Sequence, residues 1–250
     1  MKRILVWALP LILTACVTVV TPDPTSSPTL PPTPSATQTI EWFPATSTPT
    51  PIPPTLEFTP TPEKLSGVGK VIYRDDFTAN RGWTIPISSE GEINIENGEL
   101  NIIIQEPDTF LYSVLEEEVF TDFYAEITAS PSLCSGNDQY GFMFRAVDRY
   151  YRYALSCDGE ERLDLILSQS AVELQPWMVS ACVPSAAPCE VRLGVWAVGS
   201  EFRLFINGTH QFTVTNEEIA RGSLGVFARS AGETAVTVSF TDLVVREISP

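Results

Sequence analysis

The chain has 250 residues, and its 15 basic and 31 acidic residues give it a net charge of −16. Such an acidic surface repels phosphate, which argues against nucleic acid as a partner and against a basic patch that grips anionic lipid. Of the 21 prolines, 14 lie before residue 63, so we expect the folded part of the chain beyond that point.

Residues 1–15 have the pattern of a signal peptide. Lys2 and Arg3 precede an apolar run over 4–13, which is too short to cross the ~30 Å hydrocarbon core as a helix. The Leu-Thr-Ala-Cys sequence that ends at Cys16 resembles a bacterial lipobox. This resemblance implies that Cys16 is acylated and holds the protein on the extracellular face of a bacterial membrane. The alternative is an ordinary secretory signal with an incidental cysteine.

Residues 16–65 are expected to be this lipidated cysteine followed by a disordered stalk. The part from 17 to 65 contains 13 Pro, 13 Thr and 4 Ser. Proline cannot donate a hydrogen bond to a helix or sheet, and the segment has too few large apolar side chains to offset its ordering entropy. We therefore expect an extended spacer that lifts the following domain away from the membrane.

From residue 66 to 250, apolar and aromatic residues alternate with polar ones, and turn signals recur at short intervals. Asn97-Gly98 is expected to form a turn, and Asn207-Gly208 is typical of a type I′ hairpin turn. The only helix candidate is a short turn at 216–220. The pattern predicts an all-β domain, a two-sheet antiparallel β-sandwich. The expected strands cover 92–100 with its turn, 100–105, 123–129, 139–147, 150–157, 162–169, 191–198, 201–214 with its turn, 223–228 and 235–248.

Four cysteines remain beyond the predicted lipid anchor, namely Cys134, Cys157, Cys182 and Cys189. An even number in an exported domain favours two disulfides, and four cysteines allow three connectivities. Cys134 and Cys157 flank the central hairpin and are placed to tie its two ends together, whereas a Cys182–Cys189 bond would close a short loop. Zinc is the alternative, but the spacings lack the C-x2–4-C pattern of structural zinc sites.

Several packing motifs resemble the concanavalin A-like lectin/glucanase jelly rolls. They are Asp75-Asp76-Phe77 with Gly82-Trp83, Tyr140-Gly141-Phe142-Met143-Phe144-Arg145, Phe205-Ile206-Asn207-Gly208, and Phe240-Thr241-Asp242-Leu243-Val244-Val245. The likeness spans almost all of 66–250 and is nearest to the laminin-G-like and keto-disaccharide-hydrolase-like branches. It implies a jelly-roll sandwich, while activity has to be argued from the site itself.

Catalysis is not favoured by the distribution of carboxylates. The resemblance implies that a glucanase of this group carries Glu-x-Asp-x-x-Glu on one strand, and no such spacing occurs here. Glu116-Glu117-Glu118 are consecutive, Glu126 stands alone, and Glu160-Glu161 adjoin a predicted turn, so we interpret all of them as solvated charge. A hydrolase acting on disaccharides or modified sugars, which does not need that motif, remains an alternative.

A binding face is predicted from the alternation of the central hairpin. If Phe144 pairs with Tyr153, the aromatic residues of both strands point to one face and form the core. Arg145 and Arg152 then share the opposite face, where Asp164 on the next strand is available to compensate their charge. Arginine donors next to small residues suit a polar ligand such as a sugar. The alternative is a solvated sheet with an Arg–Asp pair.

Sugar sites commonly use an exposed aromatic platform, and three tryptophans lie in the predicted domain. Trp83 and Trp196 belong to the packing motifs of the resemblance and are expected to be buried. Trp177 follows a proline near a loop and is the candidate platform.

A structural Ca²⁺ site is a further expectation, because related jelly rolls often join their first and last strands through this ion. Asp75, Asp76 and Asp242 lie in those segments, and Ca²⁺ prefers carboxylate and carbonyl oxygens. The alternative is that these aspartates cap turns through backbone N–H groups.

Together these observations predict a surface lipoprotein that presents a non-catalytic jelly-roll module for glycan or another extracellular ligand. The alternatives are the hydrolase described above and a structural or adhesive module that binds protein through an apolar sheet face. The lipid on Cys16 is the only membrane contact that we expect.

Overall fold

The computed structural model describes residues 65, 67–168, 170–232 and 235–249, all of which belong to one compact unit. The predicted signal peptide, Cys16 and nearly all of the stalk lie outside the described residues. Within the described part of the chain every regular element is a strand, and no helix is long and apolar enough to cross a membrane.

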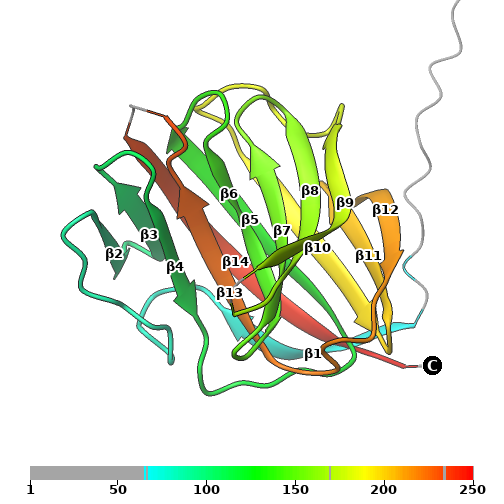
Figure 1. The fold of residues 1–250 in the computed structure, drawn as a ribbon. Coiled ribbons are helices and arrows are strands. Elements are labelled where there is room, and N and C mark those ends of the chain that lie inside the picture. The colour runs from blue at the N-terminus through cyan, green and yellow to red at the C-terminus, as the bar shows by residue number, and fades with distance from the viewer. Residues whose placement is uncertain (1–64, 66, 169, 233–234, 250) are drawn as a thin grey trace, which may run out of the picture. The chain divides into compact units, whose positions relative to one another are not determined.

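The strands form two antiparallel sheets stacked face to face, the predicted β-sandwich (Figure 1). The eight-stranded sheet has the order β12-β11-β10-β5-β14-β3-β2, and β1 also pairs with β14. Its strands are β1 (Val68–Asp75), β2 (Gly91–Glu96), β3 (Glu99–Ile104), β5 (Phe123–Leu133), β10 (Val191–Val198), β11 (Glu201–Ile206), β12 (Thr209–Thr215) and β14 (Val236–Ile248).

The six-stranded sheet has the order β4-β13-β6-β7-β8-β9. Its strands are β4 (Phe110–Val114), β6 (Gln139–Ala146), β7 (Tyr150–Ser156), β8 (Glu160–Ile166), β9 (Ala171–Val179) and β13 (Ser223–Arg229). One face of this sheet packs on the core, and we call the opposite face its outer face.

The core lies between the two sheets and takes alternate residues from each strand, as the alternation predicted. Phe142 and Phe144 of β6 and Tyr151 and Tyr153 of β7 are fully buried in it, and Phe202 of β11 contacts them from the other sheet. The register pairs Phe144 with Tyr151 and not with Tyr153. This shift of two residues keeps these four aromatic side chains on their predicted face, because the side-chain period of a strand is two.

Two tight turns have the chemistry that their sequences predicted. Asn97 and Gly98 join β2 to β3 with φ angles of 56° and 80°, and Asn207 and Gly208 join β11 to β12 with φ angles of 52° and 76°. Positive φ at both central positions is the requirement of a type I′ turn, which asparagine and glycine meet at low cost.

The helix candidate at 216–220 is wrong, because this segment is irregular. The Asn216 side chain accepts a hydrogen bond from the backbone N–H of Glu218 at 3.0 Å, which competes with a helical turn. Ile219 is then buried in the main core.

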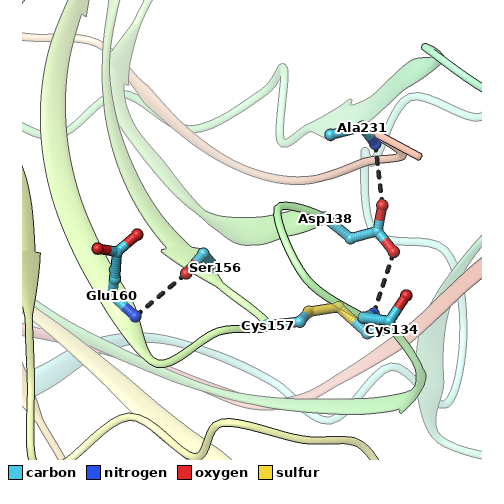
Figure 2. Close-up of a disulfide and its surroundings, with 7 residues drawn as sticks. Cys134, Asp138, Ser156, Cys157, Glu160 and Ala231 are labelled. Atoms are coloured by element: carbon cyan, nitrogen blue, oxygen red, sulfur yellow. Dashed lines mark hydrogen bonds between the residues drawn. A yellow bond between two sulfur atoms is a disulfide. The ribbon is translucent and has the colours of Figure 1, made fainter.

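A disulfide joins Cys134 to Cys157, with their Cα atoms 5.9 Å apart (Figure 2). It connects the segment before β6 to the end of β7, as predicted for the central hairpin. Beside it, the Asp138 carboxylate accepts hydrogen bonds from the backbone N–H groups of Ser135 at 3.0 Å and of Ala231 at 2.9 Å. The disulfide and this carboxylate together fix one end of the hairpin.

The second predicted disulfide is not formed, since Cys182 and Cys189 carry free thiols. The two cysteines make different contacts. Cys182 packs against the main core, and its N–H donates to the Ser180 hydroxyl at 3.2 Å. Cys189 donates its N–H to the Pro131 carbonyl at 3.2 Å, and burial raises the pKa of its thiol.

Candidate functional site

Two rows of residues cross the strands on the outer face of the six-stranded sheet. The strand register places Met143, Arg152, Asp164 and Glu173 side by side in one row, on β6, β7, β8 and β9. The adjacent row runs from Phe227 through Gly141 and Ala154 to Arg162. Both rows face away from the sandwich core because they alternate with the buried aromatic residues.

The centre of this face is the arginine–aspartate cluster, which we define as Arg152, Asp164 and Arg162. The Asp164 carboxylate is fully buried and accepts from Arg152 Nη2 at 2.8 Å and Nε at 3.3 Å. Its other oxygen accepts from Arg162 Nε at 2.9 Å and from Arg162 Nη2. Arg162 Nη2 also lies 3.4 Å from the Glu173 carboxylate. Two guanidinium planes are thus oriented by one carboxylate, at charge-assisted hydrogen-bond distances.

Aromatic rings flank both guanidinium groups. The Arg162 guanidinium lies 5.2 Å from the ring centroid of the half-buried Trp177, and that of Arg152 lies 5.8 Å from those of Phe110 and Phe227. Cations above ring faces at these distances are attracted by the ring quadrupole. The Phe227 ring rests against Gly141, where an added Cβ would come within 3.0 Å of its edge. The same Cβ would clash with the backbone carbonyl oxygen of Tyr153, so the close approach of strand and ring at this position requires glycine.

A hollow of about 740 Å³ continues the outer face across β4, and we call it the β4 hollow. Pro86, Phe110, Tyr112, Val119 and Val147 contribute its apolar wall. Phe110 is shared between this hollow and the ring contact to Arg152, so the hollow adjoins the arginine–aspartate cluster.

Arg145 is not on this face, contrary to the prediction. Its side chain is 0% exposed and lies on the other side of β6, 5.0 Å above the Phe202 ring. Its Nη1 donates to the carbonyls of Gly199 and Ile219, both at 2.8 Å, and its Nη2 donates to that of Thr121 at 2.9 Å. A β-bulge opposite Ser223 and Leu224, with φ of 51° at Arg145, breaks the alternation on which the prediction rested.

The three aspartates proposed as calcium ligands do not converge. Asp75 is fully buried and accepts from the N–H of Phe77 and the indole of Trp83, both at 2.9 Å. Asp76 instead caps the exposed turn at Thr78. Asp242 lines a different hollow with Arg74 and Arg192. Within the described residues, no group of three or more Asp, Glu, His or Cys side chains is placed to hold a metal.

Glu161 is not solvated charge, contrary to the prediction. It is fully buried on the core face of β8 and accepts a hydrogen bond from the Tyr153 hydroxyl at 2.5 Å. Burial raises the pKa of its carboxyl, and the hydrogen bond from Tyr153 opposes this shift only in part. The burial of Glu161 was indicated in the sequence by its alternation with Leu163 and Leu165, because the three residues share one face of a strand.

The tryptophan predictions are confirmed for Trp83 and Trp196, which are buried. Trp177 is half-buried and contacts the arginine–aspartate cluster. Sequence reasoning missed Arg162, Phe110 and Phe227 as members of this face. Arg162 could have been predicted from the sequence, because it alternates with Asp164 along one strand. Phe110 and Phe227 could not, because their positions depend on the register of β4 and β13 with the hairpin.

No protein-family model and no curated protein matches this chain. Solved structures with the same fold include the carbohydrate-binding module CBM66 from Bacillus subtilis, with a TM-score of 0.55 and 14% identity over 66% of this chain and 96% of that one. A Bacillus subtilis protein of unknown function with a galectin-like fold has a TM-score of 0.56 and 10% identity over 73% and 99%.

The catalytic domain of an endo-1,3-beta-glucanase (laminarinase) from Thermotoga petrophila is also similar, with a TM-score of 0.52 and 9% identity over 72% of this chain and 98% of that chain. At such low identities these likenesses establish the fold, a concanavalin A-like jelly-roll sandwich, which the sequence motifs predicted. Function has to follow from the site.

Proposed function

We propose that this domain is a non-catalytic glycan-binding module and that the sugar lies on the outer face of the six-stranded sheet. The observation that carries the proposal is the arginine–aspartate cluster with Trp177 beside it. Planar guanidinium donors suit sugar hydroxyls, and the half-buried indole suits the apolar face of a sugar ring. The carbohydrate-binding module among the similar folds supports the same class of ligand.

Binding is favoured over hydrolysis by the state of the carboxylates on this face. A glycosidase needs one carboxyl group to protonate the leaving oxygen and a second to act as nucleophile or base. Asp164 is held between two arginines, and Glu173 lies 3.4 Å from one of them. Both carboxyl groups on this face are therefore engaged with arginines, so the face does not present the two free carboxyl groups that this reaction requires.

A broad glycan array tests this function, with Arg152→Gln compared against Arg192→Gln. Arg152 belongs to the cluster, whereas Arg192 is exposed on the other sheet and matches it in chemistry. We expect the wild-type chain to bind at least one glycan class, Arg152→Gln to bind it at least about tenfold more weakly, and Arg192→Gln to bind it equally well. A blank array with folded protein would contradict the proposal.

We also propose that Cys16 is lipidated and that the domain stands on a stalk at the extracellular face of a bacterial membrane. The motif that ends at Cys16 and the Thr/Pro-rich composition of 17–65 support this part. Labelling cells with a palmitate analogue should mark the wild-type chain and not Cys16→Ala, which should leave the membrane fraction. Equal labelling of both chains would refute the anchor.

A further inference from the structure

The edges of the two sheets differ in how they are protected. β9, one edge of the six-stranded sheet, contains Glu173 and Pro176, and β2, an edge of the other sheet, contains Glu92 and Glu96. Charges and proline on an edge strand discourage pairing with another chain. β4 is the other edge of the six-stranded sheet and reads Phe-Leu-Tyr-Ser-Val, with neither a charge nor a proline. β12, the other end of the eight-stranded order, also lacks Asp, Glu, Lys, Arg and Pro, so the choice of β4 rests on its free backbone groups and on the β4 hollow beside it.

The free side of β4 presents unpaired backbone groups. Val114 uses this side, since its N–H donates to the Thr84 hydroxyl and its carbonyl accepts from the Thr84 N–H, both at 2.9 Å. Backbone groups alternate in direction along a strand, so those of Phe110 and Tyr112 also point away from β13. Among the described residues, none forms a hydrogen bond to the N–H or carbonyl groups of Phe110 and Tyr112.

Exposed apolar side chains lie beside these backbone groups. Tyr112, Val119 and Val147 line the β4 hollow and are 47%, 60% and 62% exposed. The outward-facing side chains of β4, Phe110, Tyr112 and Val114, line this hollow. A strand added to β4 would direct every second side chain into the same space, which is how strand addition combines backbone hydrogen bonds with side-chain pockets.

The charge around the hollow restricts the occupant. Glu116 lines the hollow and begins the run Glu116-Glu117-Glu118, and the whole chain carries −16. A second copy would bring the same acidic run and net charge, which repel. The chain's own segment 17–65 has 13 prolines, which lack the N–H groups that a strand needs. A segment of another protein, with Lys or Arg next to apolar residues, fits both the charge and the free backbone.

We propose that the free edge of β4 is a second binding site, which takes up an extended, basic and apolar segment of another protein as an added strand. The site depends on backbone atoms of Phe110 and Tyr112 and on the β4 hollow. It is distinct from the proposed glycan site, because the guanidinium groups of the arginine–aspartate cluster take no part in it, although Phe110 borders both.

Selection of short random peptides on the full chain tests the proposal. The selected peptides should alternate β-branched or aromatic residues with others, carry Lys or Arg, and lack proline in their centre. Tyr112→Pro removes the edge N–H at a position where an edge strand tolerates proline, and it should weaken binding at least about tenfold. The control Tyr112→Val keeps the N–H and should bind within about threefold. Equal binding by Tyr112→Pro would overturn the proposal, and so would a selection that yields no peptide.

If Tyr112→Pro does not fold, two other measurements test whether the peptide binds to β4 as an added strand. In the wild-type chain, a bound peptide should slow hydrogen exchange at the Phe110 and Tyr112 amides. N-methylation at alternate residues should abolish binding on one edge of the peptide and leave it unchanged on the other. Unaltered exchange, or equal effects of methylation on both edges, would contradict strand addition. Reversible dimerisation of the chain through β4 would assign the edge to a second copy and would overturn the proposed partner.

Discussion

Arg145 shows how one side chain can hold several loops at once. Its guanidinium donates to carbonyls of three different connections, at Thr121, Gly199 and Ile219, although the residue itself belongs to β6. The left-handed φ of 51° costs about 1 kcal/mol for a residue other than glycine. Three charge-assisted hydrogen bonds in a buried setting outweigh that cost.

Arg145→Met should therefore destabilise the domain by about 3 kcal/mol, because it leaves three carbonyls without their donor. The control is Arg149→Met, which removes an exposed ion pair to Glu218 at 3.1 Å. That change should stay within about 0.5 kcal/mol. Chemical denaturation of both variants measures the difference, and equal stability of the two would show that Arg145 does not hold the loops.

Glu161→Gln should make the domain more stable at neutral pH. Burial raises the pKa of Glu161 above its ordinary value of 4.5. The contribution of this carboxyl group to the stability of the fold is therefore complete below pH 4.5, and it is lost as the pH rises through the raised pKa of the folded protein. Glutamine still accepts the hydrogen bond from Tyr153 but carries no charge. The variant should match the wild type near pH 4 and exceed it progressively towards pH 8.

Denaturation curves across this pH range, with Glu160→Gln as the neighbouring and partly exposed control, provide the measurement. A stability difference that does not change with pH would show that Glu161 is ionised in the folded protein as readily as in the unfolded chain.

Residue placement from sequence succeeded where the alternation is regular. It assigned Phe142, Phe144, Tyr151 and Tyr153 to the core, and all four are buried. It failed at Arg145, because a bulge shifts the phase of a strand and leaves no local signal in the sequence. The bulge is held by contacts from distant loops, which only the fold brings together.

At the scale of elements, turn chemistry was the strongest local signal. Asn-Gly located both tight turns, of which the one at Asn207-Gly208 was predicted as type I′, and the strands on either side followed from them. β1, β4 and β9 were not predicted. β4 has only five residues, β9 contains Pro176, and β1 carries Gly69 and Lys70 in a largely exposed strand. These three strands are short, interrupted by proline or largely exposed, so their sequence pattern is weak.

The central hairpin should depend on its disulfide. The bond between Cys134 and Cys157 closes a loop with a sequence separation of 23, and such a loop stabilises a domain by about 3 kcal/mol through the unfolded state. Replacing both cysteines with alanine should lower the unfolding free energy by this amount. Cys182→Ala with Cys189→Ala is the matched control and should not abolish the response of the protein to reductant. Insensitivity of the wild type to reductant would contradict the pairing.

At the scale of the whole molecule, the all-β sandwich was predictable because a period-two pattern recurs through 66–250. The binding face was only partly predictable. Arg152, Asp164 and Trp177 were named from sequence, and the structure brings them together with Arg162. The β4 hollow and its free edge were not foreseen, since they depend on the order of strands in the sheet.

Trp177→Ala should weaken glycan binding about tenfold, because an aromatic platform contributes about 1 kcal/mol or more to a stacked ligand. Trp177→Phe keeps a ring and should retain most of the affinity. Isothermal titration with a glycan found on the array measures both variants. If Trp177→Ala bound with full affinity, the indole of Trp177 would not be part of the glycan site.

The location of the glycan site can be measured by mapping where a bound glycan perturbs the backbone and indole N–H signals of the labelled protein. We predict shifts concentrated at Arg152, Arg162 and Trp177 on the outer face of the six-stranded sheet. Shifts concentrated instead around Thr128 and Arg192 on the eight-stranded sheet would contradict it.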